Sequence, residues 1–599
     1  MGTTCLYTRK KRQPLPALAA AAATLALALL FGCSKEERRP ETDARTPEPL
    51  PAATPLPTDT PVPDWYNAPV DFGGQDALLT AVQYALKTSD TQIPGSALAQ
   101  VEELILVDGA RIRDLSPLQH AESLRTLVIL DGGMELAPLA ELPELTRLTL
   151  TGGHFGDLTH VAALRNLQEL NLFGYETRDF TPLAGLNGLH TLRLGNHMRY
   201  EYTGLSELRG LTTLLLADGA RTDLSWLGDM TQLESLTIWP CKQRDIPWIG
   251  ALKNLKSLHL NLRTNCDLSP LADLPELTRL AVNYESGRMY DALWINRLTA
   301  VEELYLSGTY FGELADFAGM ERLRALTLDD VQITVDLAEM PAFPELAALT
   351  IKNCGVVNAQ RLSGLPKLTS LALSGGSIDN CRAVYALTNL TSLTLRPRPQ
   401  GGYGSLGGVE QLERLVNLTE LDWGGRAGKL ETISSLPKLE RLSLRGAKVR
   451  SLDDLTGLTK LKTLDVSANS FSKIPDLSKL TELTEFVMTD SRINDFTGLA
   501  TLPGLTHATL QGDRIADAAQ LAESERLYAV RLVDDVDSQR HAEKLAAAQR
   551  AVDEALRAKT PYANTADTDA VKNRFLLKDY LHRPSYGSAE WFWLLETTY

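Results

Sequence analysis

Three glycines and one glutamate carry the spacing of a dinucleotide-binding loop. Gly402, Gly404 and Gly407 form a G-x-G-x-x-G phrase after an apolar pair at Leu393 and Leu395, and Glu420 follows eighteen residues after Gly402. In nucleotide-binding folds such glycines let the backbone approach a pyrophosphate, and the acidic residue binds the ribose. Here the phrase stands in the insertion of one long repeat, not in a strand–helix–strand unit. We therefore expect no nucleotide and no other cofactor at this position.

The other catalytic and metal-binding patterns are missing from the sequence. The nine histidines form no H-E-x-x-H phrase, and no G-x-S-x-G phrase occurs. Cys241 and Cys266, and likewise Cys354 and Cys381, are separated by 25 and 27 residues, which is no zinc-binding spacing. Two alternatives stay open for these four cysteines: buried free thiols, or disulfides 241–266 and 354–381 in an exported protein. We expect no enzymatic activity, no catalytic residue and no bound metal.

A pair of apolar residues two positions apart recurs along most of the chain. The pair occurs twenty times, mostly at intervals of 21 to 24 residues, with one interval of 28. The first residues of the pairs are Leu104, Leu127, Leu148, Leu170, Leu192, Leu214, Leu236, Leu258, Leu280, Leu304, Leu326, Leu349, Leu371, Leu393, Leu421, Leu442, Leu464, Phe486, Ala508 and Val530. Residues at i and i+2 of a strand point to the same face. Stacked units of this kind bury one continuous apolar ridge under a parallel sheet, which a single unit cannot do.

The segment after each pair has a pattern of its own. In the first unit the chain bends at Ser116 and Pro117, so Leu115, Leu118 and Leu124 are expected to be buried. The phrase L-x-x-L-x-L, followed by D-L-x-P-L-x-x-L, resembles the 22-residue leucine-rich repeats of internalin-like bacterial surface proteins, over roughly residues 101–533. The resemblance implies an α/β repeat solenoid, an arc of about twenty units with a parallel concave sheet and helical caps.

One position departs from that family's pattern. The family carries Asn three positions after the second strand leucine, where its amide holds the backbone turn. Only Asn469 fills this slot cleanly here, and glycine can take the turn without strain. Other residues in the slot include Gly109, Gly132, Gly153, Gly219, Gly376, Cys241 and Cys354. We expect the asparagine ladder to be absent and the turns to be looser.

The two ends of the repeat region have helical patterns. Residues 72–106 contain apolar residues at helical spacing, including Leu78 and Val82, and resemble the helical cap of similar surface proteins, which we assign to residues 67–100. After Leu532 the pattern becomes helical again, so residues 534–599 are expected to form a C-terminal cap and tail. The aromatic-rich end of that tail either packs against the cap or binds a partner.

The N-terminus has the pattern of an export signal. Arg9, Lys10, Lys11 and Arg12 precede an apolar run of about 17 residues, which is short for a transmembrane helix. The phrase from Leu30 to Cys33 resembles the lipobox of bacterial lipoproteins. The resemblance implies that residues 1–32 are a signal peptide and that Cys33 is lipidated. An uncleaved anchor helix is the alternative, and either arrangement tethers the chain to the extracytoplasmic face of a membrane.

Composition agrees with a tethered surface protein. Residues 33–66 are rich in Pro, Thr and charge, so we expect a semi-rigid linker after the lipidated cysteine. The formal net charge is −15, and removal of residues 1–32 takes away four basic residues and no acidic residue, which gives −19 for the mature chain. An acidic surface disfavours nucleic acid as a partner.

Large side chains stand beside the strand leucines in repeats four to ten. Aromatic residues with a polar group, and arginine, dominate the binding energy of many interfaces. We predict that these side chains face solvent on the concave sheet and bind a ligand: Phe173, Tyr175, Arg193, Trp239, His259, Asn283 and Tyr305. The alternative is a scatter of aromatic residues on an ordinary surface.

Three functions are compatible with this sequence. The first is a membrane-anchored bacterial surface protein that binds a protein or glycan ligand through its concave face. The second is a scaffold lipoprotein that organises envelope proteins, and the third is an accessory or specificity module of an enzyme system. The fold does not decide among them, because one scaffold serves unrelated partners.

Overall fold

The computed structural model describes residues 63–533 apart from short gaps, of which the longest are 397–408 and 512–528. The predicted signal peptide, nearly all of the predicted linker, Cys33, the glycine-rich insertion and the predicted C-terminal cap with its aromatic tail lie outside the described residues. The chain divides into two compact units, one that runs to Leu224 and one that begins at Ser225.

The first unit begins with three short helices and continues with parallel strands. Helix α3 buries Leu78 and Val82, as their helical spacing predicts. The helices are α2 (Asp64–Asn67), α3 (Asp76–Ala85) and α4 (Gly95–Leu98). The strands are β1 (Glu103–Leu106), β2 (Thr126–Leu130), β3 (Arg147–Thr151), β4 (Glu169–Phe173), β5 (Thr191–Gly195) and β6 (Thr213–Ala217), each paired in parallel with the next.

The second unit continues the same pattern from β7 to β22. Its strands are β7 (Ser235–Cys241), β8 (Ser257–Leu262), β9 (Arg279–Tyr284), β10 (Glu303–Ser307), β11 (Ala325–Asp329), β13 (Ala348–Lys352), β15 (Ser370–Ser374), β16 (Ser392–Arg396), β17 (Glu420–Trp423), β18 (Arg441–Ser443), β19 (Thr463–Asp465), β20 (Glu485–Met488), β21 (His507–Gln511) and β22 (Ala529–Val533). These strands are also paired in parallel, each with the next in this order. Two further strands, β12 (Thr334–Asp336) and β14 (Gly355–Val357), pair separately.

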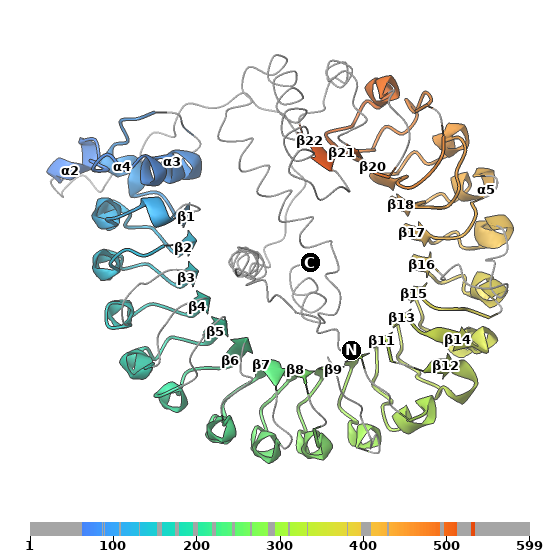
Figure 1. Ribbon diagram of the computed structural model, residues 1–599, viewed down its shortest axis with the longest axis horizontal. Coiled ribbons are helices and arrows are strands. Elements are labelled where there is room, and N and C mark those ends of the chain that lie inside the picture. The colour runs from blue at the N-terminus through green and yellow to red at the C-terminus, as the bar shows by residue number, and fades with distance from the viewer. Residues whose placement is uncertain are drawn as a thin grey trace, which may run out of the picture. The chain divides into compact units, whose positions relative to one another are not determined.

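Short helices alternate with the strands. In each unit the strands line the inner side of a curved stack and the short helices line its outer side (Figure 1). Most of them are 3-10 turns: in the first unit η1 (Gly109–Arg111), η2 (Ser116–His120), η3 (Ala137–Glu141), η4 (Val161–Ala163), η5 (Thr181–Gly185) and η6 (Leu205–Glu207). In the second unit they are η8 (Ser225–Asp229), η9 (Pro247–Ala251), η10 (Ser269–Asp273), η11 (Ile295–Arg297), η12 (Leu314–Phe317), η13 (Leu337–Glu339), η14 (Ala359–Gly364), η15 (Cys381–Ala386), η16 (Val409–Arg414), η17 (Asp453–Gly457) and η18 (Thr497–Thr501), with the α-helix α5 (Glu431–Ser434) between η16 and η17.

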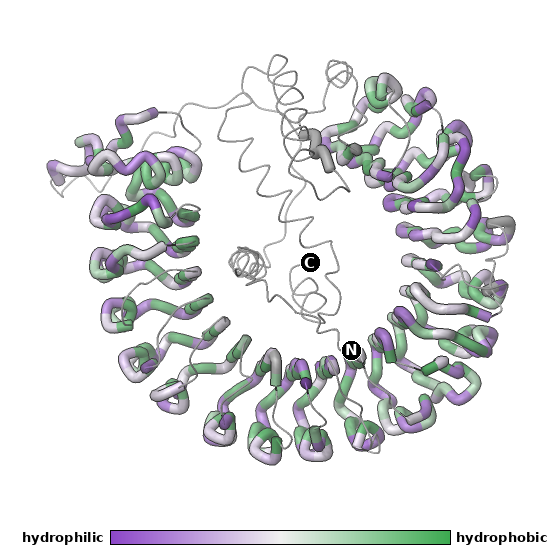
Figure 2. Tube along the Cα trace, in the orientation of Figure 1, coloured by the Kyte–Doolittle hydropathy of each residue, from purple (hydrophilic) through white to green (hydrophobic). Residues whose placement is uncertain are grey.

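The strand leucines form the core, as the repeat spacing predicts. Leu148 pairs with Leu170 and Leu170 with Leu192, all three fully buried. Leu115, Leu118 and Leu124 of the first repeat are buried as well. The alternation of apolar and polar residues recurs from one repeat to the next (Figure 2).

The turn after the strand is held in different ways in different repeats. Asn469 accepts a hydrogen bond from the Val449 amide (2.9 Å) and donates to the Leu444 and Val466 carbonyls at 2.8 and 2.9 Å. In the same slot the Cys354 thiol donates to the Lys352 carbonyl (2.9 Å) and accepts from the Val331 amide (3.4 Å). The cysteine therefore replaces part of the asparagine's hydrogen bonding, and this turn is not simply left loose.

Glycine in the slot serves close packing. A Cβ atom on Gly376 would stand 1.6 Å from the Cys354 carbonyl oxygen of the preceding repeat. No side chain fits at that distance, so neighbouring repeats approach each other more closely there than any other residue would permit.

Two of the cysteines agree with the first of the two alternatives: Cys241 and Cys354 are buried and form no disulfide bond. Cys266 also forms none but is half-buried, and the side chain of Cys381 lies outside the described residues. Burial raises the pKa of the Cys354 thiol to about 11, so it stays protonated at neutral pH.

None of the helices in the described ranges is both long and apolar enough to cross a membrane.

Loss of one strand leucine should destabilise the first unit. Leu214 of β6 is 1% exposed, and Leu214→Ala should lower the free energy of unfolding by roughly 2–5 kcal/mol through lost apolar burial and the cavity it leaves. Chemical denaturation followed by circular dichroism measures the change. Val416→Ala, at a side chain that is 48% exposed, is the control. A loss below about 1 kcal/mol for Leu214→Ala would contradict the burial of this strand leucine.

Candidate ligand-binding face

Three columns of side chains cover the face of each sheet opposite the strand leucines. We call them leading, middle and trailing, for residues before, between and after the two leucines of a strand. Register places Arg193 of β5 beside Asn171 of β4 in the middle column, and Phe173 beside Gly195 in the trailing column. In the second unit the middle column runs from His259 through Ala281 to Tyr305.

Every described residue of the predicted site lies in one of these columns, but the predicted exposure is wrong for most of them. Phe173 is 1% exposed, Asn283 3%, Tyr305 6% and His259 7%. Arg193 and Trp239 are half-buried, and Tyr175 lies outside the described residues. The set also divides between the two units, so the columns of each unit form a separate candidate surface.

Close spacing of the strands explains the burial of Phe173. Parallel strands lie about 4.8 Å apart, so a large side chain can lie flat across small ones on the next strands. A Cβ atom on Gly195 would stand 2.6 Å from Cδ1 of Phe173 and 3.3 Å from Cβ of Ala217. The ring therefore covers Gly195 and is a packing group as well as a surface group.

Polar side chains of the first unit satisfy one another. Asn171 donates to the Thr149 hydroxyl and to the Glu169 carboxylate, both at 3.0 Å. Arg193 forms an ion pair with Glu169 and donates to the Asn171 side-chain oxygen at 3.2 Å. Because Glu169 and Asn171 are buried, this network holds Arg193 in place. The repeat pattern did not predict this network, although Glu169 and Asn171 fall in the leading and middle columns.

His259 is one of the residues on the second unit's face that carry a buried polar atom without a hydrogen-bond partner. Its Nε2 atom is buried and has no hydrogen-bond partner, and burial lowers the pKa of His259 to about 4. The imidazole is therefore neutral at physiological pH. A buried polar atom without a partner costs about 1–3 kcal/mol, which a hydrogen bond from a ligand would recover.

Tyr305 is engaged within the sheet. Its hydroxyl interacts with Ser307 of the same strand and with the Asp329 carboxylate of β11. Burial and, next, the negative charge of Asp329 raise the pKa of Tyr305 above its usual value. The tyrosine is neutral and its position is fixed by the neighbouring strand.

Further along the second unit, charged residues in and next to the columns form a strip that the repeat pattern did not predict. Arg396 of β16 donates to Asp422 (2.6 Å) and to the Ser443 hydroxyl (2.8 Å). Arg445 donates to the Asp490 carboxylate at 2.5 Å. We call Arg396, Asp422, Arg445 and Asp490 the charged strip. Three of these residues could have been found from the register, because Arg396, Asp422 and Arg445 directly follow strand leucines, whereas Asp490 lies one residue beyond the trailing column.

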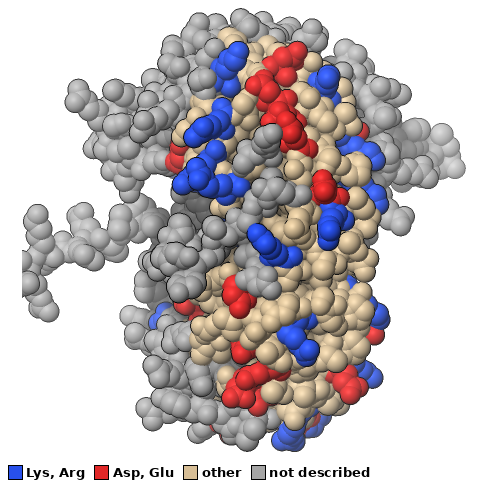
Figure 3. Space-filling model, turned by 90° about the vertical axis from the view of Figure 1, so that its right-hand side faces the viewer, with Lys and Arg blue, Asp and Glu red and all other residues tan. Residues whose placement is uncertain are grey.

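The outer side of the second unit has mixed charge. Basic and acidic side chains are interspersed on the face shown in Figure 3. Ion pairs link neighbouring repeats, among them Lys367–Glu345 at 2.6 Å and Lys462–Glu440 at 2.9 Å. All four side chains are substantially exposed, so each pair contributes little stability.

Within the described ranges, no group of three or more His, Cys, Asp or Glu side chains could hold a metal ion.

Comparison with known proteins supports the fold. No protein-family model matches the sequence, and no curated protein matches it. TLR13, solved in complex with ssRNA13, is 19% identical over 74% of this chain and 70% of that chain, with a TM-score of 0.50. An internalin from Listeria monocytogenes is 18% identical over 74% of this chain and 97% of that chain, with a TM-score of 0.31. A leucine-rich repeat protein from Leptospira interrogans is 19% identical over 69% and 90% of the two chains, with a TM-score of 0.32.

At these levels of sequence identity, similarity to the solved structures shows the fold alone. The paired parallel strands, their recurring leucines and the short outer helices make the chain a leucine-rich repeat solenoid. This confirms the fold class that the 22-residue interval predicts.

The burial of His259 should make stability depend on pH. An unperturbed imidazole has a pKa of about 6.5, so as pH falls the unfolded chain binds this proton before the folded chain does. The free energy of unfolding should therefore decrease from about pH 6.5 to about pH 4 and level off below, by up to about 3 kcal/mol from this group.

Substitution isolates that contribution from the other titrating groups. Denaturation of wild type and His259→Gln at pH 7 and pH 4.5 should show a smaller acid loss in the variant. His190→Gln, at an exposed histidine, should behave as wild type. An equal acid loss in wild type and His259→Gln would contradict the lowered pKa.

Proposed function

We propose that this chain is a membrane-anchored bacterial surface protein that binds a protein or glycan ligand through the concave face of its repeats, and that it is not an enzyme. The unpartnered Nε2 atom of His259 carries the proposal. It lies on a strand face whose neighbouring residues, Thr237 and Ala281, are small and uncharged. A ligand that hydrogen-bonds to this atom must first move aside the groups that bury it, but it breaks no internal hydrogen bond.

The surroundings of His259 suit a neutral contact. Trp239, Asn261 and Asn283 occupy the trailing column beside it on β7, β8 and β9. Indole and amide groups combine apolar contact with hydrogen bonding, and such groups dominate many recognition surfaces. Although TLR13 was solved with an RNA, the net charge of −15 disfavours nucleic acid as the ligand of this chain.

Lipidation at Cys33 supplies the membrane anchor in this proposal. The lipobox-like phrase that ends at Cys33 and the basic and apolar segments before it support this assignment. A linker rich in proline over residues 33–66 would hold the repeats away from the membrane. A scaffold lipoprotein that organises envelope proteins is the alternative, because it would use the same anchor and the same repeats.

The concave face can be tested by ligand capture. Cross-linking the full-length chain to its neighbours, followed by mass spectrometry, should identify a ligand that binds it reversibly. Trp239→Ala combined with His259→Gln should weaken that binding tenfold or more, with secondary structure retained. Val416→Ala, at an exposed residue outside the strands, should bind as wild type. Unchanged binding by the double variant would refute the concave site, and capture of envelope proteins alone would favour the scaffold.

The anchor has its own test. Cys33→Ser should abolish incorporation of a labelled fatty acid and shift the chain to the precursor form or out of the membrane fraction. Cys5→Ser, which lies before the lipobox-like phrase, should be labelled and cleaved normally. Retention of Cys33→Ser in the membrane at the wild-type mass would leave the uncleaved anchor helix as the explanation.

A further inference from the structure

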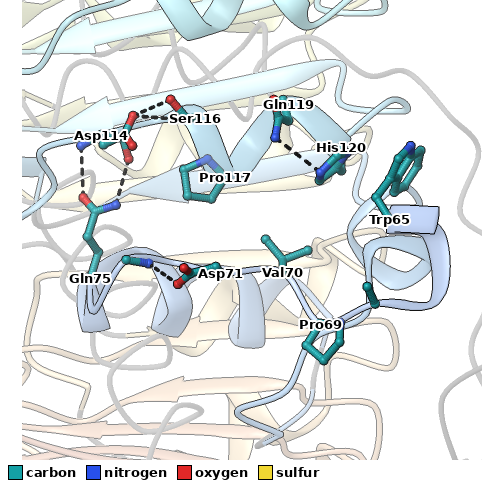
Figure 4. Close-up of a pocket in the computed structure, with 12 residues that line it drawn as sticks. Trp65, Pro69, Val70, Asp71, Gln75, Asp114, Ser116, Pro117, Gln119 and His120 are labelled. Carbon is teal, nitrogen blue, oxygen red and sulfur yellow. Dashed lines mark hydrogen bonds between the residues drawn. The ribbon is translucent and has the colours of Figure 1, made fainter. Parts of the chain in front are cut away.

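A groove lies at the start of the first unit, between the N-terminal helices and the first repeat. One wall is the connection between α2 and α3, with Pro69, Val70 and Asp71, and the other is η2, with Pro117 and His120 (Figure 4). Its volume of about 360 Å³ is near the lower limit of ligand pockets, which is roughly 300 Å³. The size suits one extended side chain better than a large ligand.

Aromatic packing fixes one end of the groove. The rings of Trp65 and His120 are stacked, with centroids 4.4 Å apart and an interplanar angle of 14°. A Cβ atom on Gly95 would stand 2.6 Å from Cε3 of Trp65, so the indole is held between the imidazole and the backbone of α4. The groove is therefore shaped before any ligand arrives.

Hydrogen bonds within the walls use the side-chain amides. Gln75 donates to the Asp114 carbonyl (3.0 Å) and accepts from the Arg113 and Asp114 amides at 2.8 and 3.0 Å. The Gln119 amide nitrogen lies 3.3 Å from Nε2 of His120. The Gln75 contacts link the cap to the first repeat, and both amide hydrogens of Gln75 are used, because it also donates to the Phe72 carbonyl at 3.2 Å.

Acceptors remain on the two carboxylates. Oδ1 of Asp71 accepts from the Gly73 amide at 2.8 Å, and Oδ1 of Asp114 accepts from the Ser116 amide (2.8 Å) and hydroxyl (2.7 Å). The Oδ2 atoms take no part in these bonds. The Ser116 hydroxyl and amide lower the pKa of Asp114, so it remains ionised at neutral pH. No Lys or Arg is among the residues that line the groove.

We propose that this groove binds a basic side chain, an arginine or lysine, of a protein partner. The aliphatic stem would lie between the Pro69 and Pro117 rings, and the cationic end would meet the carboxylates of Asp71 and Asp114. Charge complementarity favours this ligand because the charged groups of the lining are all acidic. The carboxylate oxygens that accept no internal hydrogen bond can accept bonds from a cationic group with several donors. The site is separate from the concave face and does not depend on the function proposed for it.

Three short peptides test the chemistry on the full-length chain. Ligand-observed NMR titration should show saturable binding of acetyl-Gly-Arg-Gly-amide and of its lysine analogue. The citrulline analogue has nearly the same shape as the arginine peptide but no charge, and it should bind at least threefold more weakly. Equal binding of the citrulline peptide would overturn the proposal. Tighter binding of spermidine than of either basic peptide would overturn the choice of a protein partner.

Matched variants test the location. Asp71→Asn and Asp114→Asn should each weaken binding of the arginine peptide about threefold or more. Both keep an oxygen that can accept the local amide hydrogen bond, and thermal melting checks that they fold. Asp179→Asn is the control, because Asp179 accepts the same kind of bond from the Thr181 amide (2.9 Å) in the same unit and does not line the groove. An equal loss in the control would mean that diffuse charge attracts the peptide, and the groove would be excluded.

Discussion

Burial of two apolar residues per strand against the strands before and after it is the constraint on which this structure depends. Leu148 and Leu150 of β3 stand in register with Leu170 and Leu172 of β4. A slip by one residue would turn every strand leucine to the opposite face, so each connection must return the chain to the same register. The longest interval, 28 residues between Leu393 and Leu421, ends in the same pairing as the others. The register of the sheet is therefore kept across the longest interval.

The same constraint shapes the opposite face. Once the leucines are in register, the residues between and beside them form columns with a spacing of about 4.8 Å. A large residue in such a column reaches its neighbour, as Phe173 reaches Gly195. A charged residue forms hydrogen bonds one or two strands away, as Arg396 does with Asp422 and Ser443. Fold and surface chemistry are thus not independent in this chain.

Most of the fold follows from the sequence because one pattern repeats many times. The interval of 22 residues predicts the strands, their parallel order and the buried face, and residues such as Leu115 and Leu118 lie where that pattern requires. The register also places Phe173, His259 and Tyr305 in the correct columns. Their burial could not be predicted, because it depends on the size of residues one and two strands away, more than twenty positions distant in the sequence.

Features that occur only once in the chain were harder to predict from the repeat pattern. The hydrogen bonds of the Cys354 thiol replace those of an asparagine, but no rule of the repeat distinguishes that role from simple apolar packing. The groove beside Asp71 and Asp114 joins segments about forty residues apart through the bridge made by Gln75. Periodicity carries no information about such a contact, since it is made only where the repeat begins.

Two kinds of surface coexist on the inner face of the second unit, and they differ in what a partner must displace. In the charged strip, Arg396 and Arg445 already bind carboxylates within the sheet. A partner there would have to desolvate or separate ion pairs, and the cost offsets much of what new contacts contribute. At His259 the polar atom has no internal partner and its ring is uncharged at neutral pH. In the proposed function, a neutral ligand that reaches this atom would remove an existing penalty and break no internal hydrogen bond. This favours the neutral part of the face as the binding site, although the charged strip offers more polar groups.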